Sequence, residues 1–270
     1  MSRPSQPPKP AKEPDTRLDD LFARLKAEPP TPMIPPASFL EACAAFGIQF
    51  EPGDLERLGL YLALLLEANA AINLTAVRDA DEAWTRHIFD ALTLMPLLAE
   101  ISETTDGVTR VMDIGSGGGV PALPLACVLP DVSITLLEPT AKKARFLDCA
   151  IAVIGLSNAW VLSDRAERAA REPEHRDAYH AATARAVGRL NVVAELTLPF
   201  LRPEGLALFV KGAKADEELE EARPALHRLL SQHAQTVDTP TGRVVVVRKL
   251  RETPHAYPRR DGEPKRDPLR

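Results

Sequence analysis

The sequence predicts an α/β fold in which a mainly parallel sheet carries helices on both faces and an α-helical cap precedes the sheet. From about residue 105 onward, short apolar runs of strand length alternate with longer segments of helical periodicity. That alternation is typical of a parallel sheet with helical crossovers. Residues 37–104, in contrast, show helical periodicity alone. A glycine-rich loop directly after the first predicted strand supports the same fold class, because it predicts a strand, loop and helix unit.

The alternating part of the chain predicts strands and helices in regular order. Strands are expected at 110–114, 132–137, 159–162, 179–184, 205–210, 236–238 and 244–247. Helices are expected between them, at 122–128, 141–154, 187–200 and 213–231. The last two strands flank Gly242, which predicts an antiparallel hairpin at the end of the sheet.

We divide the chain into four parts. Residues 1–36 contain ten prolines and predict a mostly disordered tail, with a short helix near 18–26. Residues 37–104 predict a helical cap, whose third helix is capped by Asp79 or Asp81. Residues 105–250 predict the α/β domain, and residues 251–270 a basic C-terminal tail.

Composition and charge exclude several classes of protein. No segment reaches the roughly 18 apolar residues of a membrane span, and the N-terminus lacks a signal-peptide core, so we expect a cytoplasmic protein without a membrane partner. Three scattered cysteines have no metal-ligand spacing and predict reduced core residues. The net charge of −5 argues against coating nucleic acid by bulk electrostatics. Residues 243–270, however, carry +5 and the remainder −10.

The glycine-rich loop is the strongest single pattern. The apolar strand ends in the acid Asp113, and glycines at 115, 117, 118 and 119 let the backbone turn with no Cβ in the way. A dinucleotide motif would need a further glycine at the position of Val120, so a pyrophosphate site is the weaker fit. The second strand ends in Glu138, whose carboxylate can accept both hydroxyls of a ribose. Together these features predict an adenosine-containing ligand, as in methyltransferases that bind S-adenosylmethionine.

Other candidate residues follow the carboxyl ends of the remaining strands, where ligands bind in such sheets. Ala166 and Glu167 follow the third strand and can accept a hydrogen bond from the exocyclic amine of adenine. Basic residues at strand ends predict a positive rim suited to a phosphate-bearing substrate. This rim consists of Arg165, Arg185, Arg189 and Lys211.

Polar residues in the cap leave two interpretations open. Asn73 and Thr75 either hold a turn between two helices, which we favour, or border a pocket. For His87, a structural histidine is favoured over a base or a metal ligand.

These motifs together resemble the ribosomal RNA small subunit methyltransferase G family, also called glucose-inhibited division protein B. The resemblance runs from about residue 40 to the C-terminus. It rests on Asn73-Leu74-Thr75, Arg86-His87 with Asp90, the loop Asp113 to Pro121, Arg185-Ala186, Lys211-Gly212 and the tail around Tyr257-Pro258-Arg259-Arg260. The chain differs from the usual family pattern in Val120-Pro121-Ala122, where Val120 still supplies an apolar wall, and in having Glu138 where the family more often has Asp.

The resemblance implies a Rossmann-like methyltransferase that transfers the methyl group of S-adenosylmethionine to N7 of the guanine at position 527 of 16S ribosomal RNA, alone or within the small subunit. It places cofactor contacts at Gly115, Gly117, Val120, Glu138, Ala166, Glu167 and Arg185. We predict RNA contacts at Arg165, Arg189, Lys211, Arg259 and Arg260, and expect a monomer.

Guanine N7 carries no proton, so its attack on a methyl group needs no general base, and we name no catalytic residue. The signatures of enzymes that methylate exocyclic amines, Asn-Pro-Pro-Tyr or Asp-Pro-Pro-Tyr, are absent from the sequence. The alternatives are a nicotinamide-dependent oxidoreductase, a small-molecule methyltransferase and a non-catalytic cofactor-binding protein. Val120 disfavours the first, and the basic strand ends and tail disfavour the second.

Overall fold

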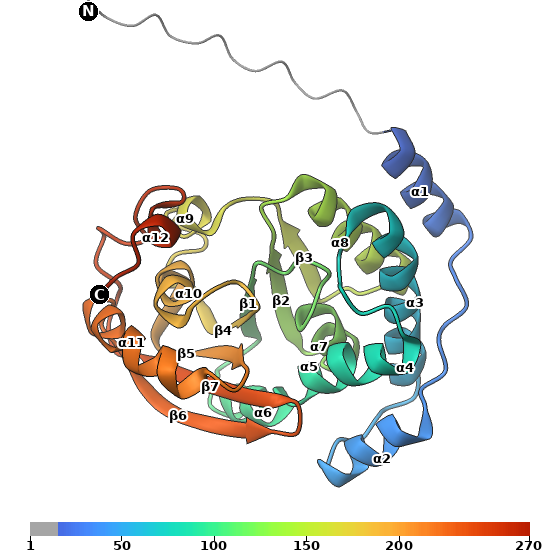
Figure 1. The fold of residues 1–270 in the computed structure, drawn as a ribbon, viewed down its shortest axis with the longest axis horizontal. Helices are drawn as coiled ribbons and strands as arrows, with labels where there is room; N and C mark the ends of the chain where they lie inside the picture. Colours follow the sequence, from blue (N-terminus) through green and yellow to red (C-terminus); the bar gives the residue numbers. More distant parts are fainter. Residues whose placement is uncertain (1–15) are drawn as a thin grey trace, which may run out of the picture.

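A computed structural model describes residues 16–270 and contains one seven-stranded sheet (Figure 1). The strand order is β3-β2-β1-β4-β5-β7-β6. The strands are β1 (Thr109–Ile114), β2 (Val132–Leu137), β3 (Ala159–Leu162), β4 (Tyr179–Arg185), β5 (Leu201–Lys211), β6 (Ser231–Thr239) and β7 (Gly242–Lys249). The first five strands are parallel, and β7 pairs antiparallel with both β5 and β6. The predicted α/β class, the mainly parallel sheet and the final hairpin are confirmed.

Helices cover both faces of the sheet, because each strand alternates its apolar side chains between two cores. Ile134 and Leu136 of β2 enter one core, whereas Met112 and Ile114 of β1 enter the other. The first core lies against the cap and two crossover helices, and the second against the remaining crossovers. The helices of the sheet domain are α7 (Ala122–Val128), α8 (Ala141–Ile154), α9 (Ala166–Ala169), α10 (Leu190–Thr197), η2 (Leu198–Phe200) and α11 (Ala215–Arg228).

The cap is helical, as predicted, and packs on α7 and α8. It comprises α2 (Ala37–Ala45), α3 (Asp54–Ile72), α4 (Ala80–Ala83), the π-helical turn η1 (Trp84–Phe89), α5 (Asp90–Leu92) and α6 (Met95–Glu103). The side chain of Asp79 accepts a hydrogen bond from the amide of Glu82 at 2.8 Å, which settles the predicted cap of the third helix. Helix α3 is covered on several sides, since Leu62 and Leu64, which point in nearly opposite directions, are both fully buried.

The short helix predicted near residues 18–26 is confirmed. The disorder predicted around it is wrong for residues 28–36, while residues 1–15 lie outside the described part. Helix α1 (Thr16–Ala27) buries Leu18, Phe22 and Leu25. These residues form an apolar stripe at helical spacing, and the proline-free stretch between residues 15 and 28 is long enough for it. The helix packs on α8, where Arg145 pairs with Asp19. The extended segment that follows then crosses α3, with the amide of Met33 donating to Gly59 O at 3.1 Å.

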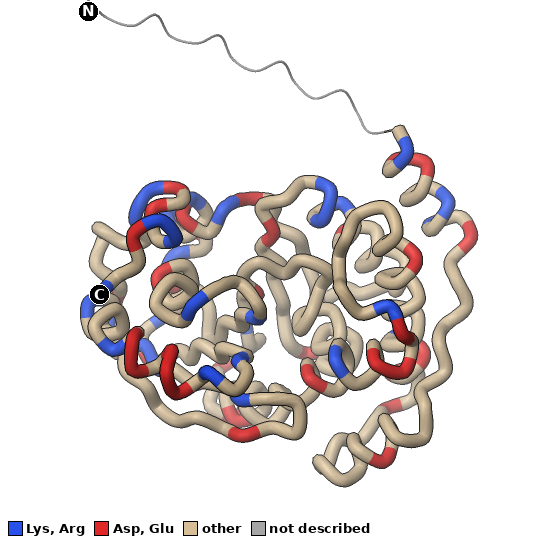
Figure 2. The backbone as a smooth tube through the Cα atoms, viewed as in Figure 1, with Lys and Arg blue, Asp and Glu red and all other residues tan. Residues whose placement is uncertain are grey.

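The C-terminal residues form an ordered segment that contains α12 (Glu263–Arg266), rather than a free basic tail. Pro258, Pro264 and Leu269 are buried, and α12 contacts α10. Among residues 16–270, basic and acidic residues lie near one another on many helices and loops (Figure 2). The positive charge of residues 251–270 therefore lies next to carboxylates.

The three cysteines are buried and free, as predicted. Burial raises the pKa of Cys43 and of Cys127 to about 12, and it also raises the pKa of Cys149. Within residues 16–270, the structure contains no helix that is both long and apolar enough to cross a membrane.

Several element boundaries differ from those predicted. Helix α10 begins at Leu190 rather than 187, and Pro199 lies in the short 3-10 turn η2 after it. Strand β5 begins at Leu201 rather than 205, because it continues through an irregular pairing with β4 near Glu204, whose φ is +67°. Strand β6 spans residues 231–239 because its pairing with β7 extends well beyond the short apolar run.

Candidate functional site

The carboxyl ends of the parallel strands meet at one edge of the sheet. Three cavities open along this edge. The loop cavity, of about 250 Å³, lies between the glycine loop and the cap. The α9 cavity, of about 130 Å³, lies between α9, α10 and α12. The hairpin cavity, of about 680 Å³, lies beside the β6–β7 turn. Gly115 lines both the loop and α9 cavities, and Arg185 lines both the loop and hairpin cavities.

The glycine loop turns back across the end of β2. The amides of Gly115 and Ser116 donate to Leu137 O at 2.8 and 3.1 Å. Gly115, Gly117 and Gly119 all have positive φ, a region that other residues enter only with strain. The loop therefore presents backbone rather than side chains to the cavities on its two sides.

Glu138 is buried at the end of β2, directly beside the loop. Its Oε2 accepts a hydrogen bond from the amide of Gly117 at 2.9 Å, and its Oε1 accepts one from the amide of Thr140 at 2.7 Å. Each carboxylate oxygen can accept more than one hydrogen bond. The side chain is thus held in place by the backbone and still offers acceptor capacity at the loop.

The cap holds the glycine loop from the opposite side. The Tyr61 hydroxyl of α3 donates to Gly118 O at 2.9 Å. A Cβ on Gly118 would lie 2.9 Å from Leu65 Cδ1, so a larger residue would push the loop and α3 apart. These contacts explain how a separate helical region comes to form one wall of the loop cavity.

Asp113 is buried beneath the glycine loop. Its Oδ1 accepts a hydrogen bond from the Thr183 hydroxyl at 2.6 Å, whereas its Oδ2 is buried without a partner among the described residues. Burial raises the pKa of Asp113 to about 6, although the hydroxyls of Ser116 and Thr183 and the charge of Arg185 oppose the shift. An unpartnered buried carboxylate oxygen is costly, so it is a candidate for a ligand contact.

The sequence left two interpretations open for the polar residues of the cap, a turn between helices and the border of a pocket, and Thr75 and His87 show features of both. Thr75 Oγ1 lies 2.8 Å from His87 Nε2, and both residues line the loop cavity. The turn itself is held by Asn69 Oδ1, which accepts from the amides of Leu74 and Thr75 at 2.7 and 2.9 Å. Burial and the nearby Arg185 lower the pKa of His87 to about 4, so this histidine is neutral at pH 7.

The α9 cavity is lined by Ala166 and Glu167, the two residues at which the sequence predicts an adenine contact. Glu167 Oε1 accepts hydrogen bonds from Arg165 Nη2 at 2.9 Å and from the amide of Gly262 at 2.7 Å. Burial alone would raise the pKa of Glu167, but these donors outweigh it and the pKa falls below its ordinary value. Glu167 is therefore an anion whose position depends on α9 and on the C-terminal segment.

The hairpin cavity is bordered by an ion pair between the cap and the sheet. Arg185 Nη1 lies 3.0 Å from Asp90 Oδ2, and the Thr241 hydroxyl donates to Asp90 Oδ1 at 2.5 Å. Lys211 lines the same cavity, and its Nζ donates to Gly188 O at 2.7 Å and to Glu218 Oε2 at 2.8 Å. This cavity is thus polar, with fixed donors and acceptors on facing walls.

Comparison with known proteins identifies the family. The model of the family described as rRNA small subunit methyltransferase G matches residues 54–245. A Sorangium cellulosum protein named ribosomal RNA small subunit methyltransferase G is 47% identical over 229 residues, which cover 85% of this chain and 94% of that protein. The Lactococcus lactis protein of the same name is 34% identical over 240 residues, which cover 87% of this chain and 99% of that protein.

This chain belongs to the rRNA small subunit methyltransferase G family. The resemblance found in the sequence is confirmed, and with it the enzyme class of an rRNA methyltransferase and the Rossmann-like interpretation of the sheet. The oxidoreductase alternative has no support in these relatives.

The structure brings the predicted cofactor residues together but shows that most predicted RNA contacts are already paired. Arg165 pairs with Glu167 and Asp261, Arg189 Nη1 lies 3.0 Å from Glu221 Oε2, and Lys211 binds Glu218. The Arg260 side chain is exposed and has no ion pair within residues 16–270. Nucleic acid would therefore have to compete with carboxylates for three of these residues.

Arg259 does not fit the RNA-facing role predicted for it. Its guanidinium is only 17% exposed and binds Glu195 of α10, with Nη2 2.6 Å from Oε2. The sequence suggested an RNA contact because the tail is basic, but the partner carboxylate lies 64 residues away and was not visible in the pattern. Arg259 is instead part of the fold around the α9 cavity.

Sequence analysis missed several residues that line the cavities. Lys143 of α8 lines the loop cavity, although it lies within a predicted helix rather than at a strand end. Thr241 lines the hairpin cavity and Pro264 the α9 cavity. Thr241 occupies a hairpin turn and Pro264 a basic tail, so neither carried a local signal for a site.

Proposed function

We propose that this member of the family transfers the methyl group of S-adenosylmethionine to N7 of a guanine in 16S ribosomal RNA. The observation that carries the proposal is the row of three adjoining cavities along one edge of the sheet. Shared walls at Gly115 and Arg185 allow a cofactor to lie across the first two cavities and a base to enter the third.

The residues around the loop suit the cofactor. We place its methionine part in the loop cavity, its ribose at Glu138 and its adenine in the α9 cavity against Ala166 and Glu167. The Gly119 backbone has no room for a Cβ, and the unpartnered Asp113 Oδ2 is buried next to the loop. Bound there, the cofactor supplies an electrophilic methyl group on a sulfonium.

The hairpin cavity suits the base. Its volume of about 680 Å³ falls within the usual ~300–1,000 Å³ of ligand sites. Arg185 and Lys211 can donate hydrogen bonds to guanine O6 or to neighbouring phosphates, leaving N7 free to attack. The fixed pairs with Asp90 and Glu218 hold both cations in position, so their alignment requires little ordering when the base enters.

Alignment, rather than proton transfer, would then accelerate the reaction. N7 carries no proton, and the neutral His87 faces the loop cavity without needing to act as a base. Positioning of two reacting groups can contribute up to about 7–11 kcal/mol. Methyl transfer makes the base cationic, and Asp90 at the cavity wall can offset that charge.

For the outer RNA contacts we propose Arg165, Arg189, Lys211 and Arg260, with Arg259 removed from the set for the reason given above. The substrate class places the enzyme in the cytoplasm. Because the three cavities are built within one chain, we propose that a monomer is active.

The deciding experiment is transfer of radiolabelled methyl from S-adenosylmethionine to small-subunit particles from cells that lack this protein. Label at a guanine N7 in these particles, with none in methylated control particles, is the expected result. Absence of transfer despite measurable cofactor binding would overturn the proposed substrate while leaving the cofactor site intact.

Arg185→Ala tests the placement of the base. We expect this variant to lower methyl transfer by at least about tenfold, since it removes a charged hydrogen bond at the shared wall of two cavities. Arg248→Ala is a matched control: Arg248 also pairs with a carboxylate, but it lies opposite Leu206, toward the other end of β5. Unchanged cofactor affinity and transfer in Arg185→Ala would remove Arg185 from the site.

A further inference from the structure

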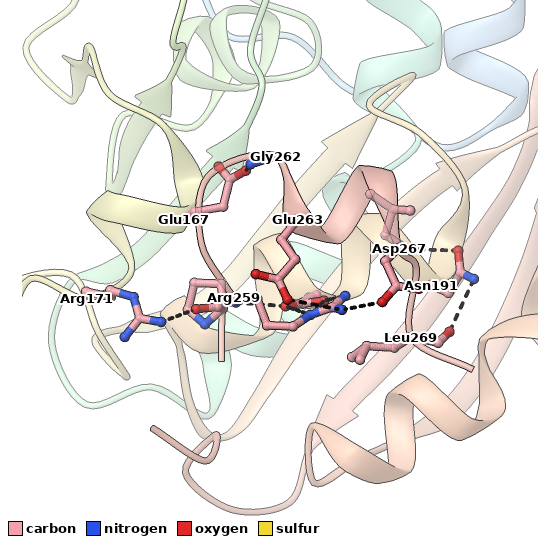
Figure 3. Close-up of polar contacts among 11 residues, drawn as sticks. Glu167, Arg171, Asn191, Arg259, Gly262, Glu263, Asp267 and Leu269 are labelled. Atoms are coloured by element: carbon pink, nitrogen blue, oxygen red, sulfur yellow. Dashed lines mark hydrogen bonds and ion pairs between the residues drawn. The ribbon is translucent and has the colours of Figure 1, made fainter. Parts of the chain in front are cut away.

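The C-terminal segment is tied to the sheet domain through many polar contacts that involve its backbone. Arg176 donates to the carbonyl oxygens of Thr253 and Tyr257 at 2.6 and 3.1 Å. Arg171 donates to Pro258 O, and Asn191 donates to Leu269 O at 3.4 Å. Figure 3 shows the contacts of Arg171 and of Asn191. The course of residues 253–269 is thus fixed by side chains from the region between β3 and β5.

The strongest of these contacts is the ion pair between Glu195 and Arg259. The Glu195 side chain is fully buried within the second core. Its Oε1 accepts from the Arg259 amide at 2.8 Å and from Arg259 Nε at 2.9 Å, and its Oε2 accepts from Nη2 at 2.6 Å. A buried carboxylate without a partner is strongly unfavourable, so Glu195 favours the docked position of this segment.

Docking brings the segment into the α9 cavity. Pro264 and Lys265 line this cavity opposite Leu137 and Val187. In addition, the Gly262 amide donates to Glu167 Oε1 at 2.7 Å (Figure 3). The donor from Arg165 uses the same oxygen, so neither donor occupies Glu167 Oε2. One oxygen of Glu167 is therefore fixed by the protein, and the other can receive a hydrogen bond from a ligand.

We infer that residues 257–266 form the outer wall of the adenine site and that the Glu195–Arg259 pair positions Glu167 to accept a hydrogen bond from the adenine amine. The inference rests on the proposed function, because it assumes that the adenine occupies the α9 cavity. It makes Arg259 a positioning residue for the cofactor, and it gives this segment a part in recognising adenine rather than RNA.

The test compares two ligands of the full-length protein, S-adenosylhomocysteine and its inosine analogue, in which a carbonyl replaces the exocyclic amine. Wild-type protein should bind the adenine compound more tightly, because the amine at its 6-position donates to Glu167, whereas the inosine carbonyl at that position can only accept and would face the carboxylate. Arg259→Met removes the charge but keeps the aliphatic length, and it should reduce this preference by about tenfold, the equivalent of one hydrogen bond. Arg259→Lys should retain part of the preference because lysine keeps the charge without the bidentate geometry.

Arg251→Ala is the matched control, since this arginine lies outside residues 257–266, is exposed and has no ion pair in the described chain. This variant should keep the ligand preference of the wild type. A purely structural role for Arg259 would weaken both ligands equally and leave the preference unchanged, which would overturn the inference. Loss of RNA affinity with an unchanged preference for the adenine ligand would indicate that Arg259 contacts RNA instead.

Hydrogen exchange on the unaltered protein covers the case in which Arg259→Met does not fold. Because coupling is reciprocal, S-adenosylhomocysteine should slow exchange at the Gly262 amide and across residues 257–266. Unchanged exchange there, despite bound ligand, would contradict the inference. If wild-type protein binds neither compound, the proposed function fails instead, so the two failures are distinguishable.

Discussion

The loop cavity and the α9 cavity share Gly115 but are held together by different forces. At the loop cavity, the glycine loop and the cap turn are held by apolar packing and neutral hydrogen bonds, such as those of Tyr61 with Gly118 and Thr75 with His87, although Arg185 also lines the cavity. The α9 cavity is walled by ion pairs, Glu167 with Arg165 and, behind it, Glu195 with Arg259.

The difference extends to the buried acids. Asp113 lies under the loop cavity with one oxygen unpartnered, whereas Glu167 and Glu195 each bind an arginine. The first region is therefore sensitive to volume and to ionisation of a single group, and the second to loss of a charge partner. The first three experiments below each disturb one of these regions and leave the other unchanged, and the fourth concerns the rim outside both.

The largest effect is expected for Gly119→Ala in the loop. The new Cβ would lie 2.6 Å from Leu123 Cδ1, and the φ of +98° is unfavourable for alanine. Overpacking and backbone strain each cost about 1–3 kcal/mol, so we expect a loss of about 2–6 kcal/mol in unfolding free energy and no detectable cofactor binding. Urea unfolding and calorimetry would measure the two quantities.

Gly155→Ala is the control for this change, because Gly155 has a φ of +78° and nothing within 4 Å of the added Cβ. It carries the strain without the overlap. Equal losses in the two variants would show that close packing under the loop is not what selects glycine at 119.

Breaking the buried ion pair should have the next largest effect. Glu195→Ala leaves the mostly buried Arg259 without its carboxylate, which typically costs about 3–5 kcal/mol of unfolding free energy. Glu220→Ala breaks an exposed pair with Arg223 and should change stability little. Thermal unfolding of both variants decides the matter, and similar midpoints would mean that the α9 region does not depend on charge pairing.

Asp113→Asn should change stability in a pH-dependent way. The folded-state pKa of Asp113 is raised to about 6 from 3.8, so the folded protein holds this proton more tightly than the unfolded chain does. Ionised Asp113 therefore destabilises the wild type increasingly between pH 4 and 6. Asparagine does not ionise, so the variant should become more stable relative to the wild type over that range. Above pH 6 the difference in unfolding free energy should reach roughly 3 kcal/mol.

Thr183→Val is the companion variant, because it removes the hydroxyl that donates to Asp113 and keeps the carboxyl group. Its stability should still fall with rising pH in this range, and by more than in the wild type, because the lost hydroxyl had opposed the rise in the Asp113 pKa. A stability difference between Asp113→Asn and wild type that does not vary with pH would contradict the raised pKa.

The smallest effect is expected for Arg189→Ala at the rim. Arg189 is 64% exposed and pairs with Glu221, so stability should hardly change. If Arg189 contacts a phosphate, the slope of log affinity for ribosomal RNA against log salt should decrease by about one unit. Arg248→Ala should leave the slope unchanged. An identical slope in both variants would mean that Arg189 makes no phosphate contact.

The two cavities also differ in how far the sequence predicted them. The glycine loop, Asp113 and Glu138 occur at the ends of short apolar strands, so local pattern was enough to place them at one edge. The wall of the α9 cavity depends on Glu195 with Arg259 and on Glu167 with Gly262, which are 64 and 95 residues apart. Nothing in a single sequence pairs such residues, and the same basic tail could equally face RNA.

Helix α1 was predicted, but its packing on the fold was not. Leu18, Phe22 and Leu25 have the spacing of an amphipathic helix, whereas the prolines around it indicated a disordered tail. Cavity residues such as Thr241 gave no comparable signal, because its contact with Asp90 spans 151 residues. Local periodicity can thus reveal elements, whereas sites formed by distant segments need the fold.

The three buried cysteines make the native protein a poor target for thiol reagents, because only an exposed thiolate reacts readily. Their labelling rates would therefore count how often each region opens. Cys43 lies in α2 of the cap, whereas Cys127 and Cys149 lie in the two crossover helices α7 and α8. Faster labelling of Cys43 than of the other two would mean that the cap opens while the sheet domain stays closed. Mass spectrometry could follow the labelling without the introduction of a new cysteine.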